Sequence, residues 1–214
     1  MCIGRAIAGF KAAKESALTL SGLAHAHCSL AYVHLSLKTN LEQAAENAQT
    51  TLAVLNRLGH HRFTKLKMHA VHYLAESLVL LGRTAEVESL LASNVETVQA
   101  TTTVPKDAND LSMLRLAMRI NLSISHYNRN RVQEALQVLE PFLSLGHMHV
   151  PDWLAQRNAS SVPIPPRPFI HVSGQATGPF TTTVVTVVAL VLLKQKNYEA
   201  AVETLRNHRE YFPI

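Results

Sequence analysis

The sequence predicts an all-α protein in which antiparallel helix pairs stack on one another, and three observations support this. Apolar residues recur at helical spacing through most of the 214-residue chain. Short polar turns, such as Gln195-Lys196-Asn197, separate the two helices of a pair. A compact residue recurs early in each second helix, where two helix backbones approach each other. These four residues are Ala44, Val87, Ala135 and Ala201.

The pattern divides the chain into four repeats. They span about 23–56, 66–94, 112–145 and 181–212. A helix–turn–helix unit of about 34 residues is the signature of tetratricopeptide repeats. We therefore predict one helical-repeat domain over 1–214, a tetratricopeptide-type α-solenoid. A further helix is expected from Arg5 to about Ser21, as the second half of a truncated repeat.

Individual positions within the repeats carry more specific expectations. Tyr198, Ala201 and Leu205 lie three and four residues apart, which predicts that they share one buried face. Gly82 is expected to end the first helix of the second repeat in a left-handed conformation, which glycine adopts without strain.

Two linkers separate the later repeats. Residues 97–110 are polar and are expected to form a mobile loop. Residues 145–180 contain a proline-rich run that favours extended backbone, together with Trp153, Phe169 and Phe180. Because exposed aromatic side chains favour burial, we expect this segment to be partly ordered against the last two repeats.

The beginning of the chain and its most apolar run could be read as targeting or membrane segments. Residues 1–14 contain three basic and no acidic residues, which loosely resembles a mitochondrial transit peptide. Repeat arrays normally begin with a polar cap, so we favour a fragment of a longer protein. Residues 181–193 are apolar but fall short of the roughly 20 residues of a membrane-spanning helix, so a buried helix is expected.

Composition argues against several function classes. The chain is 47% hydrophobic and has a net charge of +5, with no cluster of basic and aromatic residues. Direct nucleic-acid binding is therefore not expected. The two cysteines, Cys2 and Cys28, form no disulfide framework and fit a reducing compartment, which favours the cytoplasm, with the nucleus as a second location.

No catalytic, cofactor-binding or metal-binding motif is apparent. The sequence has no glycine-rich phosphate loop, no His-Glu-x-x-His motif and no Gly-x-Ser-x-Gly motif. Its 12 histidines include the pairs His69/His72 and His147/His149, but no nearby acidic residue or cysteine completes a ligand set. We expect a protein that is not an enzyme, binds no small-molecule substrate, and carries no cofactor and no metal.

The expected partner surface is a protein-binding one. Chaperone-binding repeats carry a cluster of Lys, Arg and Asn on the concave faces of their first helices, and this cluster is absent here. Those faces instead carry histidine, glutamate and apolar residues, and the aromatic residues of repeat three and of the long linker are further candidates. The candidate partner-binding residues are His69, His72, Glu76, Ile120, Ile124, Tyr127, Trp153 and Phe169.

Several short segments follow one another in a family-specific order. They are LAYVHLSL (30–37), YLAESL (73–78), LGR (81–83), LL (90–91) and NV (94–95), followed by INL (120–122) and VAL (188–190). From about Ser29 to the end, the chain resembles the C-terminal tetratricopeptide-repeat region of the tenth subunit of the CCR–NOT deadenylase complex.

That resemblance implies a non-catalytic scaffold subunit in mRNA deadenylation and decay. It would dock the eleventh subunit and, together with it, the large scaffold subunit of the complex. Two alternatives remain open at this point: a tetratricopeptide adaptor of another multiprotein assembly, and an RNA-binding helical repeat.

Overall fold

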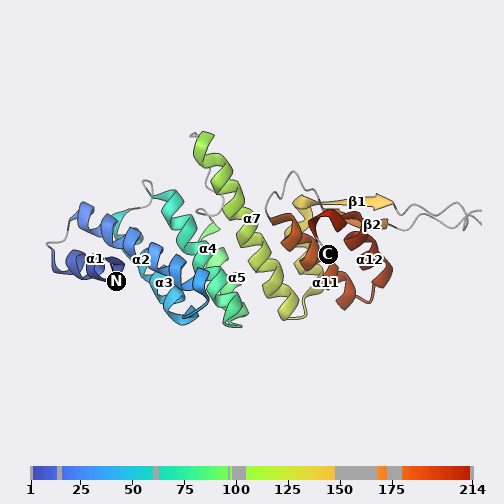
Figure 1. Ribbon diagram of the computed structural model, residues 1–214, viewed down its shortest axis with the longest axis horizontal. Helices are drawn as coiled ribbons and strands as arrows, with labels where there is room; N and C mark the ends of the chain where they lie inside the picture. Colours follow the sequence, from blue (N-terminus) through green and yellow to red (C-terminus); the bar gives the residue numbers. More distant parts are fainter. Residues whose placement is uncertain are drawn as a thin grey trace, which may run out of the picture. The chain divides into compact units, whose positions relative to one another are not determined.

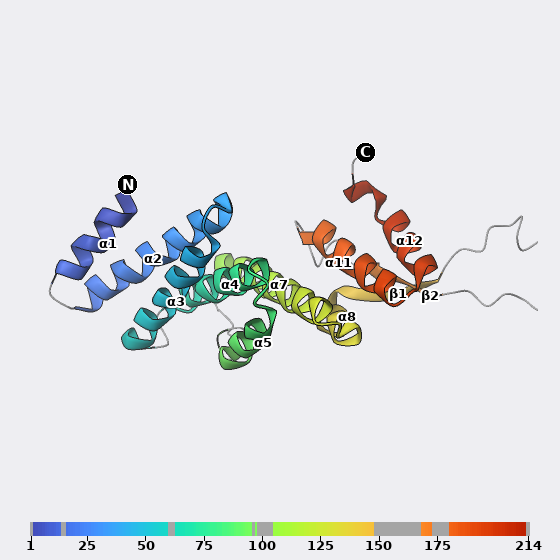
Figure 2. The ribbon, with the colours of Figure 1, turned by 90° about the horizontal axis from the view of Figure 1, so that it is seen from below.

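The computed structural model describes residues 2–13, 16–59, 63–95, 97, 105–147, 168–172 and 180–212. The chain divides into two compact units, Met1–Arg129 and Asn130–Ile214. The division falls in the turn of the third predicted repeat. Figures 1 and 2 show that both units consist mainly of helices, as the sequence predicted.

The first unit is built from helices that each pack on their neighbours. Helix α4 packs against both α2 and α3, and α7 packs against both α4 and α5. Helix α1 folds back beside α2 (Figure 2). The elements are α1 (Cys2–Ala12), α2 (Ala17–Leu37), α3 (Leu41–Leu58), α4 (Thr64–Leu80), α5 (Thr84–Ser93) and α7 (Pro105–Asn128).

Side-chain caps explain where α2 and α3 begin. The Ser16 hydroxyl accepts a hydrogen bond from the Thr19 backbone N–H, and the Thr19 hydroxyl accepts one from the Ser16 N–H. Asn40 caps α3, since its side-chain oxygen accepts a hydrogen bond from the Gln43 backbone N–H. The expectation of one helix from Arg5 to Ser21 was wrong, because the capping box at Ser16 starts a new helix.

The turn between α4 and α5 matches its prediction. Gly82 has a φ of +73°, and its N–H donates to the Val79 carbonyl while Arg83 N–H donates to Leu78. This conformation costs glycine little. Helix α5, which follows this turn, is joined to α7 by a hydrogen bond. The Ser125 hydroxyl on α7 donates to the Thr84 carbonyl of α5 over 2.6 Å.

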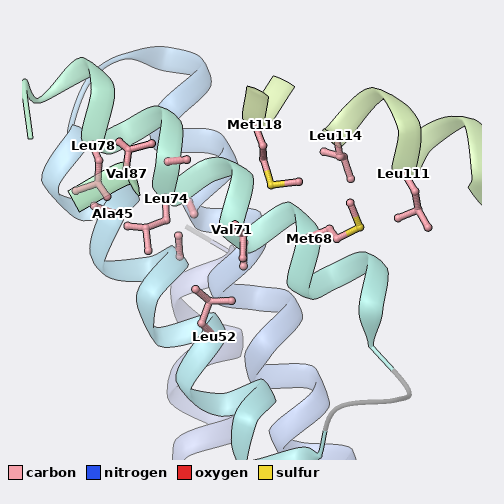
Figure 3. Packing of buried hydrophobic residues seen from close by; sticks show 14 residues of the cluster. Ala45, Leu52, Met68, Val71, Leu74, Leu78, Val87, Leu111, Leu114 and Met118 are labelled. Carbon is pink, nitrogen blue, oxygen red and sulfur yellow. The ribbon is translucent and has the colours of Figure 1, made fainter. Parts of the chain in front are cut away.

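The core of the first unit lies on the side of α4 that faces α3, α5 and α7. Met68, Val71 and Leu74 project from α4 toward Leu111, Leu114 and Met118 of α7 and toward α3 and α5 (Figure 3). Val87, on α5, lies beside Leu78 at the other end of the cluster. Close packing of these side chains fixes the positions of α2, α3, α5 and α7 around α4.

The predicted linker over 97–110 is shorter than expected. Helix α7 begins at Pro105, so the assignment of residues 105–110 to a loop was wrong. Proline suits the first helical position, since its missing N–H has no helical partner there.

In the described residues, the second unit contains three α-helices and a two-stranded sheet. Its elements are α8 (Val132–Leu139), η1 (Glu140–Phe142), β1 (Leu143–His147), β2 (Pro168–Val172), α11 (Thr181–Lys194), α12 (Tyr198–Asn207) and η3 (Arg209–Tyr211). Helix α11 packs against α8 and α12, and β2 lies against α12 and α11.

The strand pair adds an element that the predicted all-α class did not include. Strands β1 and β2 are antiparallel, with Leu145 opposite Ile170. Strand β2 contains Phe169, Ile170 and Val172, residue types that favour strands, and Pro168 stands at a strand end, where its missing N–H is tolerated. The contact of β2 with α12 and α11 agrees with the expected ordering of residues 145–180 against the last helices. Residues 148–167 and 173–179 lie outside the described part.

The apolar run over 181–193 forms α11, whose bounds match the prediction. Val184, Val185 and Val188 are fully buried. Within the described residues, no helix combines the length and the apolar character needed to cross a membrane.

The four compact residues at the predicted helix crossings are all buried. Ala44, Val87 and Ala135 are fully buried and Ala201 is 1% exposed. The predicted face of α12 was wrong in part. Tyr198 and Leu205 are exposed, because Ala201, Thr204 and His208 form the buried stripe of this segment. The His208 ring Nδ1 lies 2.7 Å from the Thr204 carbonyl oxygen.

Candidate functional site

A shallow pocket lies where α2 and α4 run side by side in the first unit. Its volume is about 230 Å³, which is below the roughly 300–1,000 Å³ of typical cofactor and small-molecule sites. Such a pocket suits a single side chain of a partner. We call it the α2–α4 pocket, and it is lined by His25, Cys28, Ser29, Tyr32 and Val33 of α2 and by Leu66, His69 and Tyr73 of α4.

Tyr73 stands at the centre of an aromatic group. Its ring centroid lies 5.8 Å from that of Tyr32, 5.6 Å from that of His69 and 5.5 Å from that of His72. Its hydroxyl lies 3.3 Å from the His69 Nδ1. Helical geometry explains the assembly, because residues four apart on α4 share a face and α2 brings Tyr32 to the same place.

The exposure of Tyr32 distinguishes this group from an ordinary core. Tyr32 is 54% exposed, although it lies in the apolar segment 30–37 of the first predicted repeat. Its neighbours Ala31 and Leu35 are buried instead. The ring therefore presents apolar surface at the pocket that no other described element covers.

Burial keeps Tyr73, which lines the pocket, and the adjacent His72 uncharged. Burial, assisted by the nearby Cys28, Tyr32 and Glu76, raises the pKa of Tyr73 to about 12. Burial and the neighbouring His69 lower the pKa of His72 to about 4. At neutral pH both the Tyr73 phenol and the His72 imidazole are therefore neutral.

Glu76 lies one turn beyond Tyr73 on α4. Its Oε2 lies 3.5 Å from the His72 Nε2, and its side chain is 39% exposed. Burial raises the pKa of the Glu76 carboxyl, and Lys38 nearby offsets this in part. Since His72 is neutral, its contact with Glu76 does not balance the charge of the carboxylate.

Thiol chemistry is disfavoured in this pocket. Burial raises the pKa of Cys28 to about 11, so the thiol stays protonated at neutral pH. Reactive cysteines have the opposite property, a lowered pKa that supplies thiolate. The Cys28 thiol therefore lacks the lowered pKa of a reactive nucleophile.

The structure brings together only some of the candidate residues predicted from sequence. His69 lines the pocket, the His72 ring lies beside Tyr73, and Glu76 contacts His72. On α7, Ile120 is buried while Ile124 and Tyr127 are half-buried, and none of the three lines the α2–α4 pocket. Phe169 stands opposite Gly146 in the strand pair, and Trp153 lies outside the described residues.

Sequence reasoning missed Tyr32, Tyr73 and Cys28 as site residues. The spacing of His69, Tyr73 and Glu76 along one helical face was available as a signal. The approach of Tyr32 was not, because it depends on how α2 packs on α4.

A second polar group links α5 and α7. Glu88 Oε1 lies 2.8 Å from Arg129 Nη1 and 3.3 Å from His126 Nδ1. These contacts join the two helices and do not form a metal site. Among the described residues, no three His, Cys, Asp or Glu side chains cluster closely enough to hold a metal ion. The expected absence of a bound metal remains a prediction.

Comparison with protein-family models, with curated proteins and with solved structures finds no significant match for this chain.

Proposed function

We propose that this chain is a non-catalytic, protein-binding scaffold subunit of the CCR–NOT deadenylase complex, folded as a tetratricopeptide-type α-solenoid. The observation that carries the proposal is the tyrosine pair at the pocket, in which the exposed ring of Tyr32 lies against the half-buried ring of Tyr73, on two consecutive first helices. A recognition surface in such a repeat lies where consecutive first helices meet. Tyrosine is enriched among residues that dominate protein–protein binding.

The order of helix packing supports the solenoid. In a repeat array, the first helix of each pair contacts both helices of the preceding pair. Helix α4 contacts α2 and α3, and α7 contacts α4 and α5. Helices α4 and α7 therefore each contact both helices of the pair before them, as expected for a repeat array.

The segments behind the family resemblance support the choice of complex. The motif at 30–37 contains Tyr32 and the motif at 73–78 contains Tyr73 and Glu76. Residues that carry the resemblance therefore meet at the α2–α4 pocket. As that resemblance implies, the protein would dock the eleventh subunit and the large scaffold subunit, in the cytoplasm and also in the nucleus.

Affinity purification of the full-length protein from its own cells, with quantitative mass spectrometry, tests this function. We expect the eleventh subunit and the large scaffold subunit to be recovered in near-stoichiometric amounts. The double variant Tyr32→Ser/Tyr73→Ser should lose them. Tyr198→Ser is the matched control, since Tyr198 is 60% exposed but lies in the second unit.

Two outcomes would contradict the proposal. Recovery of a different assembly, without deadenylase subunits, would favour an adaptor of that assembly. Equal recovery by the double variant and by the control would remove the α2–α4 pocket from the interface.

A further inference from the structure

The α2–α4 pocket has an aromatic wall that suits a cation. A Lys or Arg group within about 6 Å of a tyrosine ring is attracted to the electron-rich face. The rings of Tyr32 and Tyr73 are tilted by 41° to each other, with centroids 5.8 Å apart. The exposed ring of Tyr32 leaves part of this wall open to an incoming group.

The carboxylate of Glu76 lies one helical turn from Tyr73, and no nearby cation among the described residues fully balances its charge. Glu76 does not line the pocket itself, but it follows Tyr73 by three residues on α4, and its carboxylate lies 3.5 Å from the imidazole of His72, whose ring centroid is 5.5 Å from that of Tyr73. The Glu76 carboxylate thus contacts an imidazole that is neutral. Lys38 is the cation that acts on Glu76 within the described residues, and it offsets the effect of burial only in part.

We infer that the α2–α4 pocket binds one arginine side chain of a protein partner, stacked on Tyr32 and Tyr73 and paired with Glu76. This inference rests on the proposed function and names the chemistry that the surface recognises. The volume of about 230 Å³ suits one side chain rather than a cofactor.

Arginine fits better than lysine. The planar guanidinium stacks on aromatic rings, is more weakly hydrated than an ammonium and donates several hydrogen bonds at once. It can therefore lie on Tyr32 and still reach the carboxylate of Glu76. A nucleic acid fits less well, because its phosphates would be repelled by that carboxylate.

Aromatic NMR spectra of the full chain with labelled tyrosine rings provide the test. The probes are three blocked peptides, Gly-Arg-Gly, Gly-Lys-Gly and Gly-citrulline-Gly, at about 10 mM, above the dissociation constant of a weak contact. The arginine peptide should shift the Tyr32 and Tyr73 signals and leave that of Tyr198 unchanged. The lysine peptide should act more weakly, and the neutral citrulline peptide should have no effect.

Single variants test separately how much the Glu76 charge and the Tyr32 ring contribute to arginine binding. Glu76→Gln should weaken arginine binding by about three- to fivefold, as for a partly exposed ion pair. Tyr32→Ser should weaken it by about two- to fivefold through the lost cation–π contact. Glu46→Gln, an exposed change on α3, is the control and should leave binding unchanged. Melting curves confirm that each variant is folded.

Several results would overturn the inference. They are the absence of ring shifts with the arginine peptide, equal shifts with citrulline, or unchanged binding in folded Glu76→Gln. Shifts of the same rings by an oligoadenylate of eight nucleotides, without a response to arginine, would assign the pocket to nucleic acid.

The outcome is separable from that of the proposed function. Normal recovery of deadenylase subunits, together with no arginine binding, would end only the present inference. If the pocket binds arginine but the deadenylase subunits are not recovered, the arginine site stands and the proposed complex is refuted.

Discussion

The ring of Phe10 on α1 lies against the backbone of Gly22 on α2, so closely that a methyl group on Gly22 would stand 2.4 Å from the ring carbon Cζ. Ile3, Ile7 and Phe10 form the half-buried face of α1, and no residue of this helix is fully buried. The contact at Gly22 is therefore a principal means of holding α1 in place.

Gly22→Ala should release α1 without unfolding the rest of the first unit. The new methyl group displaces the Phe10 ring, while alanine itself favours the helical conformation of α2 by about 0.5–1 kcal/mol. Hydrogen exchange of residues 2–12 should become faster while α3 and α4 stay protected. Gly9→Ala, which meets no atom within 4 Å, is the control and should keep α1 protected.

A buried polar pair joins α2 to α3. His27 Nδ1 lies 2.7 Å from Asn47 Oδ1, and Asn47 Nδ2 donates to the Gln43 carbonyl over 2.6 Å. Asn47→Leu should leave His27 without its partner and lower the free energy of unfolding by about 1–3 kcal/mol. The double variant His27→Leu/Asn47→Leu should be less destabilised than the sum of the two single variants, measured by urea denaturation. Strict additivity would show that the pair is not coupled.

Ala201 lies in the buried stripe of α12, and it should not tolerate a larger residue. Ala201→Leu should overpack the second unit and lower the free energy of unfolding by about 1–3 kcal/mol. Val202→Leu, at a neighbouring side chain that is 52% exposed, should change stability by less than about 0.5 kcal/mol. An unchanged melting temperature for Ala201→Leu would contradict the burial of Ala201.

The neutral state of His72 predicts a pH dependence. Its pKa of about 4 in the folded chain lies below the ordinary 6.5, so the unfolded chain binds the proton first as the pH falls. Stability should therefore decrease from about pH 6.5 toward pH 4. The raised pKa of Glu76 acts in the opposite direction at lower pH, where the folded carboxyl binds the proton first.

Denaturation at pH 7.5 and 5.5 isolates the histidine effect. His72 should contribute a loss of about 1 kcal/mol between these values, and His72→Gln should remove it. His34→Gln, at a half-exposed histidine outside the pocket, should retain it. The same pH dependence in all three proteins would show that His72 is not the responsible group.

The two cysteines should differ in their reactivity. Cys2 is exposed, while Cys28 is buried and has a pKa of about 11. Iodoacetamide at pH 7.5 should modify Cys2 within minutes and leave Cys28 unmodified until guanidinium unfolds the chain. Rapid modification of the folded Cys2→Ser variant would mean that Cys28 is accessible as a thiolate.

Much of the helical structure follows from local sequence. The apolar periodicity, the turn at 195–197 and the left-handed Gly82 are determined by residues close in the chain. Compact residues such as Ala44 and Ala135 mark helix crossings because a larger side chain would separate the backbones. These features could be predicted because each depends on spacing within one or two turns of helix.

Tertiary packing decided the rest. Tyr32 and Tyr198 sit in apolar patterns, yet both are exposed, because the direction of each buried stripe depends on which neighbouring helix covers it. The meeting of Tyr32 with Tyr73 joins residues 41 positions apart, and the pairing of β1 with β2 joins strands across a long linker. Such contacts depend on how helices and strands pack in three dimensions, and the low pKa of His72 follows from the burial that this packing creates.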